Sequence, residues 1–572
     1  MTNTNNKNQF PELAGALKDV RSYFLYAGLF SAAVNLLMLV PVIYMLQVYD
    51  RVMASGSLST LAMLTLLMAG LLLALGGFEW VRSMILISAS NRIESNLRSR
   101  VSDATFKRSL MSGGMVSNAQ PVNDLASLRQ FLTGNGLFAF FDAPWVPIYI
   151  GIMFLFHPWF GFSAIIAVIV MLALTFTNEK ITNKKISEAN TLAQKVNGQF
   201  ASNLRNAEVI AAMGMRDAVA RKQNKTADEV LILQTNASQQ AGLLTSISKS
   251  FRMIMQSLML GLGALLALQQ EISPGMVIAG SLLLGRALAP IDLLVQTWKG
   301  FSNARVQYGR LGQLLEDIPK EPDTMSLPAP QGNLSAENLV VIPPGAKSPV
   351  VRGVSFQIQA GEALGIVGPS ASGKSSLARA LLGIWPAYSG AVRLDGADIS
   401  SWDRTELGPY IGYLPQDIEL FDGTISENIC RFSEASPETI VDAARIAGVH
   451  EMILHLPQGY DTVIGAAGGM LSGGQRQRIG LARAVFGNPK LLLLDEPNSN
   501  LDEQGEKELV DAIARIKATG CTVIVISHRT MVLHSMDKIL VMKEGAVINY
   551  GPKDHVLSAL MSPQRPAQSA AN

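Results

Sequence analysis

The sequence predicts a membrane α-helical domain with six spans, fused to a cytoplasmic α/β domain built around a P-loop. Hydrophobic residues make up 48% of the 572 residues and charged residues only 16%, whereas soluble chains are closer to a quarter charged. The long apolar segments all lie before residue 300. Beyond that point short apolar runs alternate with helical patterns, which is typical of an α/β domain.

Six apolar segments approach or exceed the ~20 residues needed to cross a bilayer. They are Ser22–Leu46, Leu58–Ile87, Gly136–Phe156, Trp159–Phe176, Leu243–Gln269 and Pro274–Trp298. The third and fourth meet at the turn "HPWFG", and the fifth and sixth at "EISPG". We therefore expect residues 1–20 to form a cytoplasmic N-terminal segment and residues 21–310 to form the transmembrane domain.

The loops between spans two and three and between spans four and five are long and rich in Lys and Arg, whereas the opposite loops carry little beyond Arg51. This bias predicts that the long loops and both chain ends lie in the cytoplasm. Helical apolar spacing in "NRIESNLRSRVSDATFKRSLM" predicts that the spans continue as helices below the bilayer. Membrane lipids are thus expected partners. The net charge of +2 is too small to indicate nucleic acid as a partner.

The second half is expected to contain a proline-rich linker at 311–331, an α/β domain at 332–560 and a disordered tail at 561–572. The runs "ALGIVG", "AVRLDG", "LLLLDEP" and "CTVIVIS" predict strands of a largely parallel core. Cys430 and Cys521 are far apart and lack metal-ligand spacing, so we expect reduced packing residues in a cytosolic domain.

The stretch "GPSASGKSS" matches the pattern G-x-x-x-x-G-K-S between a predicted strand and a predicted helix, which is the context a phosphate-binding P-loop requires. Lys374 is expected to hold β- and γ-phosphate oxygens and Ser375 to bind Mg²⁺. The nucleotide-binding residues expected here are Gly368, Pro369, Ser370, Ala371, Ser372, Gly373, Lys374, Ser375 and Ser376.

Two adjacent carboxylates end the apolar run "LLLLDEP". Asp495 is expected to bind Mg²⁺ and Glu496 to polarise an attacking water molecule, because an ordinary acidic strand end would not need both. His528 follows another predicted core strand and is expected to contact the γ-phosphate. Gln416 in "YLPQD" is a weaker signal by itself, since a loop glutamine is usually a surface residue.

A second loop, "LSGGQ" at 471–475, runs straight into a basic amphipathic helix. Small residues at a helix start expose backbone N–H groups, which suit an anion. One domain thus carries two phosphate-reading loops, about a hundred residues apart.

In order and spacing these motifs resemble the nucleotide-binding domain of ABC transporters. Gly368–Ser375 resembles Walker A, Leu491–Glu496 Walker B, Gln416 the Q-loop, Leu471–Gln475 the signature, "SNLD" from Ser499 the D-loop, and His528 the switch histidine. The resemblance implies ATP and Mg²⁺ as cofactors, with Glu496 and His528 catalytic. It implies Mg²⁺ contacts from Ser375, Gln416 and Asp495.

The resemblance also explains the second loop. In ABC proteins two nucleotide domains pack head to tail, so the signature of one reads the nucleotide held by the other. A homodimer is therefore implied. Ser472 and Gly474 are expected to read the γ-phosphate held by Lys374 of the partner. The resemblance also implies nucleotide binding by Gly473, Gln475 and Asp502.

The membrane half carries three more particular stretches, at 44–61, 140–160 and 285–296. They look like the type I secretion ATPases of the protease/lipase-exporter (PrtD-like) branch, and the short N-terminal segment fits that branch. The resemblance implies a six-span ABC exporter domain in a bacterial inner membrane. It implies export of an unfolded polypeptide with a C-terminal signal, a periplasmic membrane-fusion adaptor and a TolC-like outer-membrane channel.

Three other functions share part of these features. One is a lipid or drug exporter of the same fold. Another is a docking scaffold whose ATPase only gates assembly, against which the intact Glu496 argues. A soluble DNA-repair ATPase would share the nucleotide motifs but not the six spans. Ionisable residues inside the spans have two interpretations, a polar translocation path or interhelical pairs. They are Glu79, Arg82, Asp142, Arg286 and Asp292.

One position departs from the family. Pro343 stands where an aromatic residue usually stacks on adenine, and a proline ring cannot supply the ~1–3 kcal/mol of base stacking. We expect GTP to support hydrolysis within about tenfold of ATP, since tenfold corresponds to only ~1.4 kcal/mol. We expect Pro343→Tyr to lower the Michaelis constant for ATP. Parallel titrations with both nucleotides check this, and a strong ATP preference that Pro343→Tyr leaves unchanged would contradict it.

Overall fold

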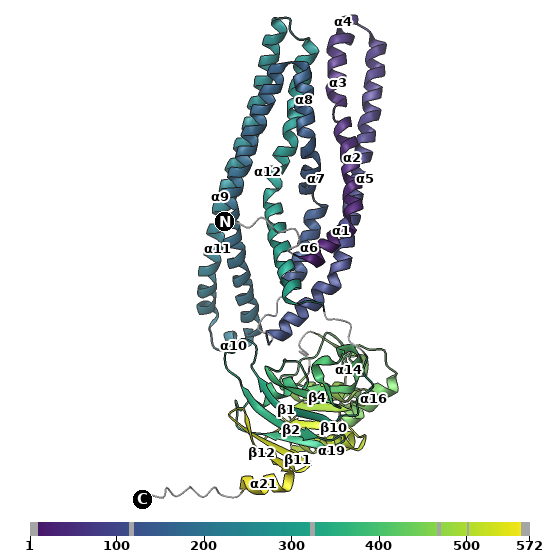
Figure 1. Ribbon diagram of the computed structural model, residues 1–572, viewed down its shortest axis with the longest axis vertical. Coiled ribbons are helices and arrows are strands. Elements are labelled where there is room, and N and C mark those ends of the chain that lie inside the picture. The colour runs from purple at the N-terminus through teal and green to yellow at the C-terminus, as the bar shows by residue number, and fades with distance from the viewer. Residues whose placement is uncertain are drawn as a thin grey trace, which may run out of the picture. The chain divides into compact units, whose positions relative to one another are not determined.

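The computed structural model describes residues 10–113, 119–320, 326–465, 471–499, 501 and 503–561 (Figure 1). The chain divides into two compact units, one of residues 1–107 and 118–319 and one of residues 108–117 and 320–572. The first is helical, and the second combines helices with sheets.

Four helices of the first half, with 44 to 54 residues each, are much longer than a membrane is thick. The bounds of the helices in this half are α1 Pro11–Asp19, α2 Arg21–Leu37, α3 Val40–Gln47, α4 Met53–Ser55, α5 Leu58–Met111, α6 Gln120–Thr133, α7 Asn135–Asp142, α8 Val146–Phe156, α9 Pro158–Arg205, α10 Ala207–Ala212, α11 Arg216–Leu268 and α12 Pro274–Asp317. The 54 residues of α5 correspond to about 80 Å at 1.5 Å per residue. The prediction that helices continue beyond the spans is therefore confirmed.

Within the described residues, six helical segments are long and apolar enough to cross a membrane, as the sequence predicts. The first consists of α2, α3, the π-helix Val48–Val52 and α4, and the third of α7, the 3₁₀ turn Ala143–Trp145 and α8. Pro144 and Pro147 explain the interruption of the third, because proline lacks the N–H that continues a helix.

Helix α12 is the centre of the first unit. It packs against α3, α6, α7, α8, α9 and α11, and Leu283, Leu284, Ala287 and Leu288 on it are fully buried. These six helices of the unit therefore share one central packing partner.

Charged side chains within the spans pair between helices. Arg82 Nη1 lies 3.0 Å from Asp142 Oδ1, and Arg252 Nη1 lies 2.8 Å from Asp292 Oδ2. The interhelical-pair interpretation is therefore confirmed for Arg82, Asp142 and Asp292.

The second unit contains two larger sheets. Its strands are β1 Leu334–Val341, β2 Val351–Ile358, β3 Ala363–Val367, β4 Ser389–Leu394, β5 Ala397–Asp398, β6 Ile411–Leu414, β7 Gly423–Thr424, β8 Val463–Ile464, β9 Leu491–Asp495, β10 Thr522–Ile526, β11 Lys538–Lys543 and β12 Ala546–Pro552. Its helices are α13 Lys374–Leu381, α14 Arg404–Leu407, α15 Ile425–Ile429, α16 Pro437–Ile446, α17 His450–Leu454, α18 Gly473–Val485, α19 Glu503–Ala518, α20 Thr530–His534 and α21 Lys553–Met561.

The main sheet has the strand order β12-β11-β3-β10-β9-β6, parallel throughout except for the β11–β12 hairpin. The largely parallel core is thus confirmed. The run "AVRLDG" forms strand β4, but in a separate antiparallel sheet of order β2-β1-β4-β5. Its sequence resembles the other apolar runs, so only long-range pairing with β1 distinguishes it.

Alternate residues of the main sheet face different cores. Leu491 and Leu493 belong to the core that contains α13 and the antiparallel sheet. Leu492 and Leu494 belong to the core that contains α18 and α19. Helices α13 and α18 therefore pack on opposite faces of the main sheet.

Asp50 holds the start of α12. Its Oδ1 accepts a hydrogen bond of 2.7 Å from Gly275 N, and its Oδ2 accepts one of 2.5 Å from Ser273 Oγ. A carboxylate at this position stabilises the unpaired N–H groups and the positive end of the helix dipole. The stretch 44–61 is in this way tied to the beginning of the central helix.

We expect Gly275→Ala to destabilise the protein, because the added Cβ would lie 2.6 Å from the Asp50 carboxylate. Overpacking of this kind costs roughly 1–3 kcal/mol. Thermal unfolding of the detergent-purified chain measures the effect. Gly261→Ala on α11 is the matched control, since a Cβ there meets nothing within 4 Å. Equal midpoints for the two variants would show that the close approach of Asp50 is unimportant.

Candidate nucleotide-binding site

The loop 368–373 joins buried strand β3 to α13 with a backbone that ordinary residues rarely adopt. Ala371 has φ 65° and Gly373 has φ 95°. A Cβ at Gly368 would lie 2.3 Å from the carbonyl oxygen of Met542, so only glycine fits there. These constraints curve the main chain around the start of α13, as a phosphate cradle requires.

Lys374 closes this loop from inside. Its Nζ donates hydrogen bonds to the carbonyl oxygens of Gly368, at 2.9 Å, and Pro369, at 3.0 Å. Burial lowers the pKa of Lys374, and the negative charges of Glu496 and Asp495 oppose that shift. Among the described residues Nζ bonds to carbonyl oxygens and to no carboxylate, so no direct ion pair there neutralises its positive charge.

Asp495 ends strand β9 as a buried carboxylate. Burial raises the pKa of Asp495, and the hydroxyl of Ser375 opposes the shift. Among the described residues its Oδ1 has no hydrogen-bond partner. An unsatisfied buried carboxylate oxygen is costly, and hard cations such as Mg²⁺ prefer oxygen ligands. The pairing of Asp495 with Ser375 therefore fits a divalent cation.

Glu496 lies beside Asp495 at the end of β9, with φ 51°. Gln416 Nε2 donates to its Oε2 at 3.0 Å, and His528 Nε2 lies 3.6 Å from its Oε1. The three residues follow β9, β6 and β10, which are neighbours in the parallel sheet. Carboxyl ends of parallel strands meet at one edge, where ligands bind in open α/β sheets.

Not all predicted site residues come together. Gln416 contacts Glu496, and within the described residues it makes no hydrogen bond to Ser375 or Asp495. Asp502 lies outside the described residues. Pro343 begins a turn after β1, in which Ala346 N donates to its carbonyl oxygen at 3.0 Å.

The second phosphate-reading loop begins α18 with a capping box. Ser472 Oγ accepts from Gln475 N at 3.2 Å, and Gln475 Oε1 accepts from Ser472 N at 2.8 Å. Gly473 and Gly474 then present backbone N–H groups without side chains. In the part of the chain that the structure describes, no hydrogen bond or ion pair joins this loop to residues 368–376. The opposite-face packing of α13 and α18 explains this separation.

Supporting residues were missed by sequence reasoning. Ser527 Oγ donates to Asn498 Oδ1 at 3.2 Å and accepts from Arg529 N at 3.1 Å, so the loop after β9 is tied to the backbone on either side of His528. Gln477 of α18 donates to the carbonyl oxygen of Pro497. These residues lie within or next to motifs, but nothing in the sequence distinguishes them from ordinary polar neighbours.

Residues 351–499 match the family model described as "ABC transporter", and residues 24–289 match "ABC transporter transmembrane region". The chain is 45% identical over 569 residues to the "Type I secretion system ATP-binding protein PrsD" of Rhizobium meliloti (strain 1021), covering 99% of this chain and 97% of that protein. It is 29% identical over 563 residues to the "Leukotoxin translocation ATP-binding protein LktB" of Mannheimia haemolytica, covering 96% of this chain and 78% of that protein.

Among solved structures, a bacterial Atm1-family ABC exporter with ATP bound has a TM-score of 0.83 at 23% identity, covering 96% of this chain and 99% of that one. At this identity the likeness concerns the fold. Together with the matched family models, it shows an ABC transmembrane domain fused to an ABC ATPase domain.

Proposed function

Because the chain belongs to the ABC transporter family, among its type I secretion ATP-binding proteins, we propose that it hydrolyses ATP to export an unfolded polypeptide across the bacterial inner membrane. The observation that carries the ATPase part is the free oxygen of buried Asp495, beside Glu496. We assign residues 21–310 to the transmembrane domain and 332–560 to a cytoplasmic ATPase domain. A periplasmic adaptor and an outer-membrane channel would complete the conduit.

The loop from Gly368 to Ser376 would wrap the phosphates of ATP. Lys374 exchanges its two carbonyl bonds for phosphate oxygens. Ser375 and Asp495 would hold Mg²⁺, with Gln416 at the edge of its shell, and the ion would supply charge neutralisation at the phosphates.

Glu496 is assigned the role of orienting the attacking water molecule and accepting its proton. Gln416 and His528 approach different oxygens of its carboxylate, so the side chain is restrained from both sides. His528 would also contact the γ-phosphate. Positioning and electrostatic stabilisation of this kind account for most of the catalysis of phosphoryl transfer.

The position of the two phosphate-reading loops supports a homodimer. Helices α13 and α18 pack on opposite faces of one sheet. One chain would therefore not bring Lys374 and Ser472 to the same phosphate. We propose that Ser472, Gly473, Gly474, Gln475 and Asp502 of one protomer meet the nucleotide held by Lys374 of its partner.

Glu496→Gln tests the catalytic role. Glutamine keeps the shape of the side chain but cannot accept the proton, so we expect ATP to bind and turnover to fall at least ~100-fold, as for other lost general bases. Phosphate release and nucleotide binding are measured on the purified chain. Glu503→Gln is the matched control, because that side chain is 82% exposed. Turnover near that of the control would remove Glu496 from this role.

Mixed dimers test action across the interface. Lys374→Ala and Ser472→Arg chains, co-expressed with different affinity tags, form one site with both defects and one intact site. We expect ATPase activity above that of either mutant homodimer. In the control, Lys374→Ala is paired with a chain carrying both substitutions, which leaves no intact site. Activity in a proven monomer would contradict the proposal.

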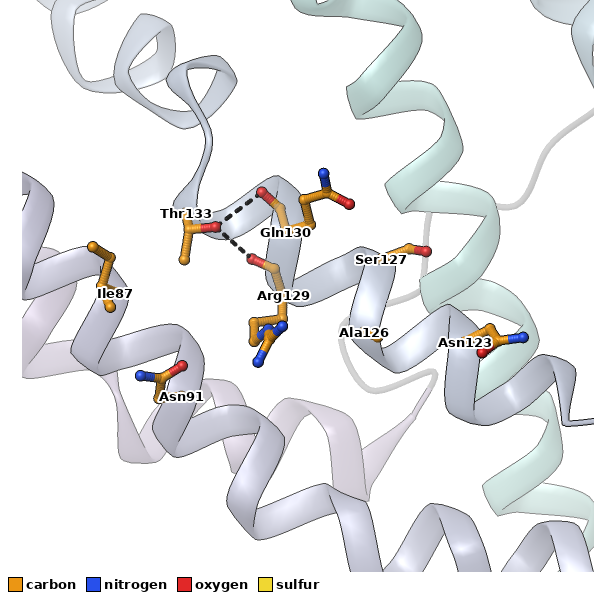
Figure 2. Close-up of a pocket in the computed structure, with 8 residues that line it drawn as sticks. All are labelled: Ile87, Asn91, Asn123, Ala126, Ser127, Arg129, Gln130 and Thr133. Carbon is orange, nitrogen blue, oxygen red and sulfur yellow. Dashed lines mark hydrogen bonds between the residues drawn. The ribbon is translucent and has the colours of Figure 1, made fainter.

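A cavity in the membrane half supports a polypeptide as cargo. It has a volume of about 830 Å³ between α5 and α6, and Figure 2 shows Asn91 of α5 and Arg129 of α6 facing each other across it. The residues that line it are Ile87, Asn91, Asn123, Ala126, Ser127, Arg129, Gln130 and Thr133.

The lining suits main-chain amides better than a lipid or an apolar drug. Within the described residues, the side-chain amides of Asn91, Asn123 and Gln130 make no hydrogen bond, so each retains a donor and an acceptor. Arg129 is neutralised by Glu94 at 2.8 Å. Asp124, on the buried side of α6, accepts two hydrogen bonds from Arg310, at 2.7 and 2.8 Å, which hold the helix in place.

A photoreactive phenylalanine analogue at Asn123 tests this assignment. We expect it to crosslink to polypeptides that are found in the culture medium of the parent strain and are missing from the medium when the gene for this chain is deleted. The control is the same analogue at Val122, an exposed position on α6 outside the lining. Crosslinks of equal yield at both positions, or only to a second copy of this chain, would contradict a cargo role for the cavity.

A further inference from the structure

The third membrane span is broken where it carries a charge. Helix α7 ends at Asp142, the 3₁₀ turn Ala143–Trp145 follows, and α8 begins at Val146. This break lies in the stretch 140–160, which no step of ATP hydrolysis uses.

Arg82 of α5 meets the break from a buried position and is 5% exposed. Its Nη1 donates to Asp142 Oδ1 and to Ser31 Oγ, each at 3.0 Å. The guanidinium also lies over the ring of Phe138, 4.2 Å from its centroid. One arginine thus contacts α2 and two positions on α7.

Asn35 of α2 completes the network. Its Nδ2 donates to Asp142 Oδ1 at 2.7 Å, and its Oδ1 accepts from the Tyr149 hydroxyl at 2.9 Å. Tyr149 lies on α8, beyond the break. The network therefore holds both sides of the interruption to α2 and α5.

Stability alone does not explain a charged pair in this place. Ionisable groups in a membrane span are costly, and apolar side chains can often replace a buried ion pair without loss of stability. An ion pair fixes the relative position of the helices it joins, because hydrogen bonds in a low-dielectric environment favour one arrangement of the bonded groups. The angle between α7 and α8 matters because α12 packs along both of them.

We propose that Arg82 and Asp142 are positioning residues for export: they hold the break between α7 and α8 at one angle against α2 and α5. The effect on export rests on the proposed function, because it requires that ATP-driven movement be transmitted to the path of the polypeptide. Without the pair α8 moves independently, and ATP is hydrolysed without export.

The structural part is tested without any cargo. Spin labels are placed on cysteines at Leu29 of α2 and Leu155 of α8, which are 67% and 85% exposed, in dimers where one protomer is labelled. We expect one narrow distance in the parent chain and a broad or second distance after Asp142→Asn or Arg82→Met. Arg82→Lys keeps a charged donor for Asp142 and should retain the narrow distance. Unchanged distances in both charge-removing variants overturn the proposal.

The functional part compares ATPase activity with the amount of extracellular protein that depends on this chain. We expect Asp142→Asn and Arg82→Met to lower that amount at least ~10-fold while ATPase activity stays within about twofold. Arg98→Met, an arginine on α5 whose side chain is 67% exposed, should change neither. Parallel losses of ATPase activity and export overturn the positioning role, because they indicate a folding defect.

If a single variant fails to accumulate, Arg82→Met combined with Asp142→Leu removes both charges together and restores an apolar contact. That variant should fold, hydrolyse ATP and still fail to export, and normal export by it overturns the proposal. If deleting the chain removes no protein from the medium, the proposed function fails, and the spin-label distances still decide whether the pair holds the break.

Discussion

Strands β3, β9 and β10 are buried along their whole length, and this constraint determines where chemistry can occur in the second unit. The interior of a strand covered on both faces consists of apolar side chains, so polar groups gather at its ends. The P-loop follows β3, Asp495 ends β9 with Glu496 next to it, and His528 lies two residues beyond β10, all at one edge of the sheet. The same burial assigns alternate residues to two cores, which places α13 and α18 on opposite faces.

In the helical unit, polar contacts between helices involve a small number of aspartates. Each of the three stretches that resemble secretion ATPases supplies one aspartate that contacts another helix. Asp50 holds the start of α12, Asp142 pairs with Arg82, and Asp292 pairs with Arg252. In an apolar solvent, helices slide and rotate easily over one another, because lipid and leucine are alike. Directional contacts of this kind favour one register between such helices.

The sequence predicts the architecture and the phosphate loop well, because those depend on local patterns. Apolar length gives the spans, and strand–loop–helix order gives Lys374 and Ser375. What sequence reasoning missed depends on pairs far apart in the chain. Arg82 and Asp142 are sixty residues apart, and nothing local says that they meet. The pairing of β4 with β1 was hidden for the same reason. The role expected for Ser472 came from family resemblance alone.

Within one chain, one side chain of each phosphate-reading loop already makes hydrogen bonds inside its own loop. Lys374 bonds to the carbonyls of its own loop, and Ser472 caps its own helix through Gln475. An arriving anion would replace the carbonyl partners of Lys374, whereas the Ser472 hydroxyl can still donate while it accepts from Gln475 N. For Lys374, phosphate binding is then an exchange of hydrogen-bond partners, whose net free energy is smaller than that of the new bonds alone. A smaller net binding free energy makes release of the ligand easier, which suits a cycle that must repeat.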